Sequence, residues 1–212
     1  MKKKSLVMML VALVLVGAVG VGATLAYLSD ATNVMTNTFT VGSGIGITQD
    51  EEDVDYDYDK DDDGKVDEDK KERTDEGNDY TDIQPGDVLV KDPTVTITAK
   101  SSDCYVFMEL KGADALTAQN FAFDGFNNNW TKVAGAEGSV LDGLYQYKEV
   151  VVKADADQVL APLFTSVTYS IDAEELKEGT KLSNVEIKSC AVQADNMTAE
   201  AALAAAQEVL AK

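Results

Sequence analysis

The chain has 212 residues, 45% of them hydrophobic, and carries a formal net charge of −20 without a single histidine. This length and hydrophobic content fit one domain with its own core. The negative charge excludes nucleic acid and anionic membranes as partners because both would repel the chain. The lack of histidine excludes histidine-dependent triads, cysteine–histidine dyads and the zinc sites of HExxH metalloproteases.

Residues 1–26 have the three-part pattern of a secretory signal peptide. Three lysines precede an uncharged run, which ends in small residues at the position that a signal peptidase reads. We therefore expect cleavage between Ala26 and Tyr27, export of the mature chain 27–212 as one domain, and a net charge of −23 after loss of the lysines. The alternative is an uncleaved anchor, since about 20 apolar residues span a bilayer. Contact with a membrane is then expected only through this leader.

The first predicted strand of the mature chain is 37–41, where Phe39 and Val41 alternate with polar residues. Ile45, Ile47 and Thr48 continue the pattern, but glycines separate them. A glycine-rich strand has a weakly specified register and is easily exchanged between partners. The strand either pairs within its own domain or pairs with another subunit.

Residues 50–82 form an acidic insert with 18 acidic and 5 basic side chains. This composition cannot bury a core, so we expect a solvated or disordered loop. Within it, DKDDDGKVD matches the first nine positions of a calcium loop, with carboxylates at Asp59, Asp61, Asp63 and Asp67. The twelfth position is Lys70 instead of glutamate, which rejects a complete EF-hand. The insert is therefore either a weak, partial Ca²⁺ loop or a plain acidic tract.

The strongest strand signals lie in residues 82–110. Pro85-Gly86 and Pro93 delimit short strands at 88–90 and 94–99, and in the second one apolar residues alternate with threonines. The run from Cys104 to Leu110 is apolar on both faces. Such a strand is either central in a sheet or has one face against a partner.

Further strands are expected at 130–133, 144–153, 166–171 and 185–192, followed by a helix over 199–211. Thr198 is a suitable N-cap for this helix. Its only large apolar residues are Leu203, Val209 and Leu210, so we expect it to dock weakly or fray. Short strands at turn-punctuated spacing with one terminal helix predict an all-β protein with an antiparallel β-sandwich.

Two cysteines, Cys104 and Cys190, are present in a chain that we expect to be exported. They either form one disulfide or remain as two half-buried thiols. The alternation does not decide between these, because Cys104 shares its face with Val106 whereas Cys190 shares its face with Lys188. A catalytic cysteine is not expected without a histidine to activate it.

Several segments, in this order along the chain, resemble the TasA/camelysin (CalY) family of secreted biofilm-matrix proteins of Gram-positive bacteria, which carry a dedicated, SipW-type signal peptide. The segments are GATLAYLSD and NTFTVGS near the N-terminus, PGD, KDPTVTI and CYVF in the centre, then Trp130, LYQYKEVV and APLFTSVTY, and finally CAVQADN before an alanine-rich helix. The last of these resembles the clostridial, alternate signal-mediated exported branch. The resemblance implies a jelly-roll sandwich whose mature N-terminal strand completes the sheet of the next subunit and so builds a fibre. The acidic insert 50–82 departs from the family pattern.

Three functions are therefore considered. The first is a secreted, non-enzymatic matrix subunit that assembles with itself or with other matrix proteins and requires no cofactor. The second is a Ca²⁺-binding surface or adhesion module. The third, a metal-dependent protease as described for the camelysin branch, is disfavoured because its metal would have to be held by carboxylates of a flexible loop.

Overall fold

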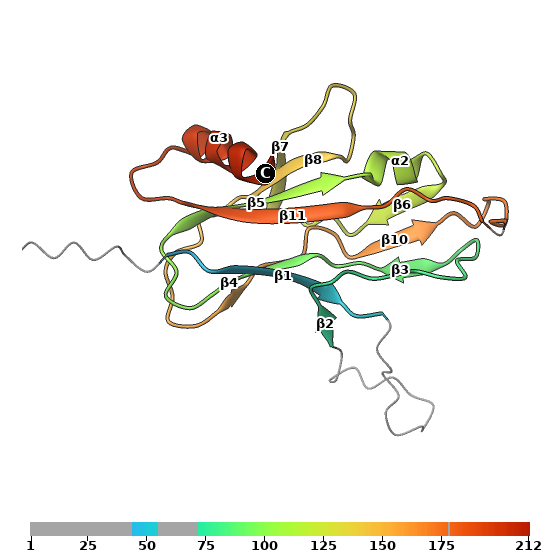
Figure 1. Ribbon diagram of the computed structural model, residues 1–212, viewed down its shortest axis with the longest axis horizontal. Helices are drawn as coiled ribbons and strands as arrows, with labels where there is room; N and C mark the ends of the chain where they lie inside the picture. Colours follow the sequence, from blue (N-terminus) through green and yellow to red (C-terminus); the bar gives the residue numbers. More distant parts are fainter. Residues whose placement is uncertain (1–43, 55–71, 178) are drawn as a thin grey trace, which may run out of the picture. The chain divides into compact units, whose positions relative to one another are not determined.

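The computed structural model describes residues 44–54, 72–177 and 179–212, and its strands make antiparallel sheets, as expected for an all-β protein (Figure 1). Gly42–Lys212 forms one compact unit. In chain order the elements are β1 (Ile47–Glu52), β2 (Arg73–Thr74), β3 (Val88–Val90), β4 (Thr94–Ile97), β5 (Cys104–Lys111), α2 (Ala113–Thr117), β6 (Phe121–Asp124), β7 (Trp130–Ala134), β8 (Gly143–Tyr147), β9 (Gln158–Val159), β10 (Ser166–Tyr169), β11 (Glu186–Gln193) and α3 (Ala199–Leu210). None of the helices in the described ranges is long and apolar enough to cross a membrane.

One layer is the four-stranded sheet β11-β5-β8-β7. Its longest ladder joins β5 to β11, with Cys104 opposite Gln193 and Lys111 opposite Glu186. Strand β5 is therefore central, which is the first of the two alternatives that its apolar faces predicted. The ladder between β5 and β8 is interrupted after Gln146, because two extra residues precede the isolated bridge from Val151 to Cys104. For this reason β8 is shorter than the predicted strand 144–153.

The opposite layer consists of two short sheets, β2-β1-β4-β9 and β3-β10-β6. Strands β3 and β4 lie end to end, and their respective partners β10 and β9 lie end to end beside them. Backbone hydrogen bonds from Lys91 N to Thr165 O and from Leu163 N to Pro93 O join the two sheets where the strands break. Pro93 explains the break between β3 and β4, since proline has no N–H for the ladder.

The main core lies between these layers and takes alternate residues from each strand. Val95 and Ile97 of β4 and Val106, Met108 and Leu110 of β5 are at most 1% exposed in it. The prediction that Ile171 continues the inward row of β10 is wrong: β10 ends at Tyr169 and the Ile171 side chain is 72% exposed.

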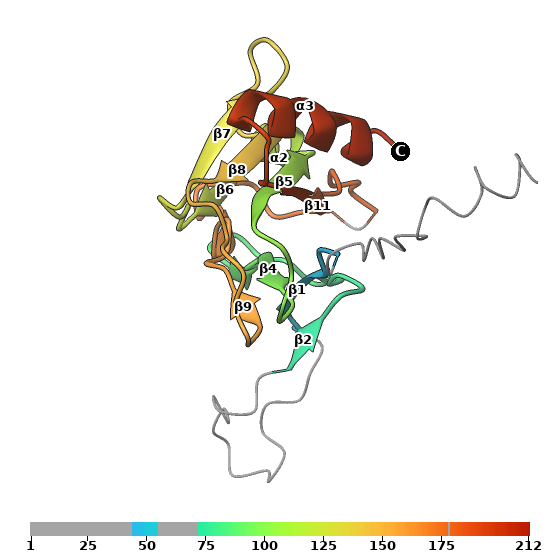
Figure 2. The ribbon, with the colours of Figure 1, turned by 90° about the vertical axis from the view of Figure 1, so that its left-hand side faces the viewer.

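Helix α3 covers the outer face of the sheet β11-β5-β8-β7 (Figure 2). Thr198 caps it as predicted, because its hydroxyl accepts a hydrogen bond from Ala201 N at 3.2 Å. The prediction of weak docking overlooked the alanines. Ala202 and Ala206 are fully buried against Phe107 and Cys190, because small side chains let the helix approach the sheet closely.

The predicted acidic insert is shorter than 50–82. Its first residues belong to β1, its last third returns through β2, and Glu51 opposite Thr74 is 6% exposed. The prediction of a wholly solvated loop was wrong at both ends because the buried carboxylate of Glu51 has a cationic partner in Lys91. The jelly-roll topology stays a prediction.

Candidate functional site

Strand β3 has one free edge among the described residues. It pairs with β10 on one side, where Leu89 faces Val167, and no described strand pairs with it on the other. Two backbone hydrogen bonds, one donated by Lys91 N and one accepted by Asp87 O, go to the β10 side and show which residues of β3 bond in that direction. Because bonding direction alternates along an antiparallel strand, Val88 and Val90 direct their N–H and C=O groups to the free edge.

The free edge of β3 continues the line of β1. Strand β4 has β9 on one side and β1 on the other, and β3 has β10 on one side. Because β10 continues from β9, the opposite edge of β3 lies on the same side as β1. Strand β1 ends at Glu52, before it reaches β3. The sheet therefore lacks one strand segment beside β3.

A groove with a volume of about 730 Å³ lies beside this edge, between β3 and the start of β11. Its apolar lining includes Leu89, Leu116, Phe121 and Val167, which also belong to the main core or pack against it, together with Ile83, Leu182 and Val185. Its polar lining includes the acidic residues Glu76, Asp79 and Glu186, together with Lys91 and Tyr80. The groove can accept apolar side chains below and a backbone hydrogen-bonded to β3 at its edge.

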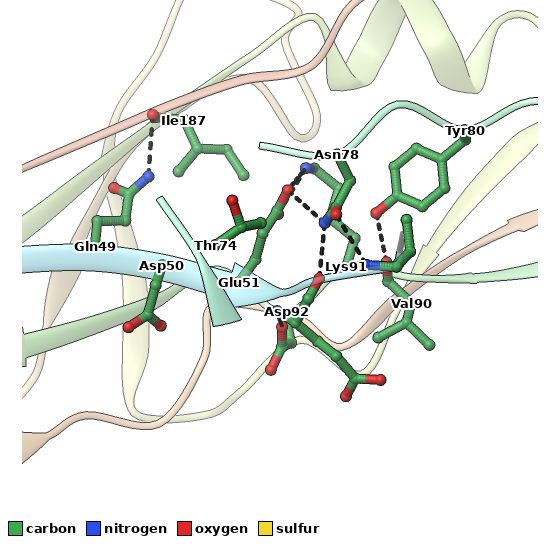
Figure 3. A network of polar contacts seen from close by, with 12 residues as sticks. Gln49, Asp50, Glu51, Thr74, Asn78, Tyr80, Val90, Lys91, Asp92 and Ile187 are labelled. Carbon is green, nitrogen blue, oxygen red and sulfur yellow. Dashed lines mark hydrogen bonds and ion pairs between the residues drawn. The ribbon is translucent and has the colours of Figure 1, made fainter. Parts of the chain in front are cut away.

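The last part of the insert, residues 76–82, runs along this groove, and we call it the return limb. Asn78 holds it to the end of β1: Nδ2 donates to Glu51 Oε1 at 3.0 Å and to Glu52 O at 2.8 Å, and Oδ1 accepts from Val54 N at 3.0 Å (Figure 3). Tyr80 donates its hydroxyl hydrogen to Val90 O on the free edge of β3. Burial and the charge of Glu51 raise the pKa of this phenol, so it remains a donor at neutral pH.

An ion pair stands at the centre of these contacts. Lys91 Nζ lies 2.7 Å from Glu51 Oε2 and 3.1 Å from Oε1, with side chains only 12% and 8% exposed. Nearby, Arg73 of β2 binds Asp50 at 2.6 Å and Asp92 at 2.8 Å. Arg73 is the only arginine of the chain. Its presence in a tract of acidic residues was a signal for a fixed contact that the sequence analysis missed.

The sequence-predicted calcium ligands Asp59, Asp61, Asp63 and Asp67 lie outside the described residues, as do the cleavage site at Ala26 and Tyr27 and the strand 37–41. The structure does describe the residues on either side of the stretch 55–71: Glu52 pairs with Arg73, and Asp53 N donates to Glu72 O at 3.1 Å. No group of three or more acidic or cysteine side chains placed for a metal occurs in the part of the chain that the structure describes.

The disulfide alternative for the two cysteines is wrong in this fold. Both thiols are free and buried, and they lie on opposite faces of the sheet β11-β5-β8-β7. Cys104 packs in the main core, whereas Cys190 packs beneath α3 opposite Phe107. Burial raises the pKa of each thiol to about 11, so neither is a thiolate at neutral pH.

Comparison with known proteins assigns the chain to no group. No family model matches it, and no match was found among curated proteins or solved structures.

Proposed function

We propose that this protein is a secreted structural subunit of an extracellular matrix, which assembles into fibres by strand exchange. The observation that supports this most strongly is the edge of β3 that no described strand pairs with, beside a groove lined by both apolar and acidic side chains, where the sheet lacks a strand segment. A strand edge that has no paired strand either is protected or is used for pairing with another chain. The protein has no catalytic role in this proposal, and assembly needs no cofactor.

The donor in this proposal is the N-terminal segment of a second copy. Residues 31–49 carry no charged side chain, although the whole chain has a net charge of −20. A neutral strand can enter a groove that contains Glu76, Asp79 and Glu186 without electrostatic repulsion. The alternation of Phe39 and Val41 with Thr38 and Thr40 would direct two apolar side chains into the groove.

The donor segment joins the described domain at one end of β1, whereas the groove lies at the other end, and this separation favours an open polymer. Gly46 is bonded to Ser101 and Thr98 at one end of β1, whereas the return limb and the groove lie at the other end, near Glu51 and Val54. Six strand residues span about 20 Å. A contact between the donor of one subunit and the groove of the next is heterologous, and such contacts produce filaments unless they close into a ring.

The test compares the mature chain from Tyr27 with a chain that begins at Gly44. This truncation removes the proposed donor but keeps Gly46 and all of β1, which are bonded within the domain. Light scattering and negative-stain microscopy measure assembly. We expect filaments from the mature chain and monomers from the truncated chain.

A matched pair of double variants tests whether assembly depends on the apolar face of the donor or only on the donor's lack of charge. Phe39→Asp with Val41→Asp places two charges on the face expected to enter the groove, and Thr38→Asp with Thr40→Asp places the same two charges on the other face. We expect the first pair to abolish filaments and the second to retain them. Filaments of equal yield from both double variants, or from the Gly44 chain, would refute strand exchange by this segment.

We also propose that the insert binds Ca²⁺ weakly through Asp59, Asp61, Asp63 and Asp67. In support, the pairing of β1 with β2 brings the two ends of the segment together, which reduces the conformational entropy that a bound ion must overcome. Calorimetric titration of the mature chain with CaCl₂ tests this, with Asp61→Asn plus Asp63→Asn as control. Equal heats from the control variant would contradict the assignment.

A further inference from the structure

The return limb occupies the place that an added strand needs. We propose that the return limb is a displaceable cover of the β3 edge, which the incoming strand of a second copy must remove before it can pair. This inference rests on the proposed function and adds a regulatory step to it. Tyr80 is the residue that decides the competition.

The geometry places Tyr80 in direct competition with a donor strand. A strand added to β3 would lie about 4.8 Å from it and would donate a backbone N–H to the carbonyl of Val90. That carbonyl already accepts the hydroxyl hydrogen of Tyr80. The Tyr80 side chain also lines the groove beside Leu89. The donor and Tyr80 therefore cannot occupy the edge together.

The limb is held at few points, so it can leave without unfolding the domain. Glu76, Gly77, Asp79, Thr81 and Asp82 are exposed, and only Asn78 and Tyr80 of the limb are half-buried. The limb is fixed mainly by the three hydrogen bonds of Asn78 and the single one of Tyr80. Lys91 Nζ also lies 6.0 Å from the centre of the Tyr80 ring, and Glu76 N donates to Thr74 Oγ1, but none of the limb's side chains is fully buried. Segments with few buried apolar contacts open at low free-energy cost.

When the donor displaces the limb, one hydrogen bond to the β3 edge is exchanged for others. Displacement breaks the Tyr80 bond to Val90 O, and the donor forms backbone hydrogen bonds with the outward groups of Val88 and Val90. The donor also contributes two apolar side chains, whereas Tyr80 is the one aromatic or apolar residue of the limb that lines the groove. The limb thus slows and weakens pairing, but it does not prevent it.

The experiment measures donor binding to a subunit that cannot use its own donor. The acceptor is the mature chain from Tyr27 with Phe39→Asp and Val41→Asp, and the probe is a fluorescent peptide of residues 35–43. Anisotropy gives Kd for this acceptor and for the same acceptor with Tyr80→Phe. The matched control is Tyr147→Phe, which removes a hydroxyl that contacts Asn129, away from the groove.

We expect Tyr80→Phe to bind the peptide about fivefold more tightly, as the loss of one typical competing hydrogen bond predicts, and Tyr147→Phe to leave Kd unchanged. Asn78→Ala, which releases the limb from β1, should also tighten binding. If the peptide binds all acceptors with Kd values within twofold, the proposal that the limb covers the β3 edge is refuted, whereas the proposal of strand exchange is not. If the peptide binds none of them, strand exchange at this edge is refuted as well.

Discussion

Replacing Lys91 by methionine tests the ion pair that holds the acidic insert to the sheet. Methionine retains most of the apolar stem but removes the ammonium group that lies 2.7 Å from Glu51 Oε2. Glu51 would then keep the hydrogen bond from Asn78 but lose its buried cationic partner. Breaking a buried ion pair by removing one partner costs about 3–5 kcal/mol, and the remaining Asn78 contact places the expected loss at about 3 kcal/mol.

Urea denaturation at pH 7 measures this loss as a change in the free energy of unfolding at unchanged m value. Two controls accompany it. Lys111→Met breaks the pair with Glu109, whose side chains are 56% and 23% exposed, and should cost less than about 1 kcal/mol. The double variant Glu51→Gln with Lys91→Met leaves no buried charge and should recover most of the loss. Equal effects of Lys91→Met and Lys111→Met, or no recovery in the double variant, would refute the argument.

Three further outcomes are expected. Both thiols should resist alkylation at pH 8 in the folded chain and react fully in urea without a reductant, since Cys104 and Cys190 are buried on opposite faces of the sheet; a protein whose thiols need a reductant would contradict this. Ala206→Leu should reduce the free energy of unfolding by about 1–3 kcal/mol because α3 cannot approach the sheet, whereas Ala204→Leu on the exposed face should be nearly neutral in the same urea assay. Burial raises the pKa of Asp114, but hydrogen bonds from Ser139 and from the backbone N–H groups of Leu141, Asp142 and Val140 outweigh it and hold the pKa below its usual value. Its stabilising contribution is therefore complete at pH 7 and is lost as the pH falls below about 4, so the stability gap between wild type and Asp114→Asn should shrink over that range in urea titrations.

The sequence predicted the parts of the fold that depend on local pattern. The alternation in β4 identified a half-buried strand, and the two apolar faces of β5 identified a strand that is central or has one face against a partner, because side-chain direction along a strand has a period of two. Thr198 identified the start of α3 for an equally local reason, since its hydroxyl reaches an N–H three residues ahead. For the candidate site, the sequence indicated only the acidic insert and the N-terminal segment that we propose as a donor.

The unpaired edge of β3, the groove and the state of the cysteines depend on tertiary structure. Which strand becomes an edge depends on where β1 ends relative to β3, and residues far apart in the sequence determine this. The faces of Cys104 and Cys190 are set by the register of β5 against β11, which no local pattern specifies. The charges of Glu51 and Asp50 suggested a solvated loop, but Lys91 and Arg73, 40 and 23 positions further along the chain, hold them at the sheet. Long-range contacts of this kind reverse the solvent exposure that local composition predicts, because a buried charge is tolerated only where the fold supplies its partner.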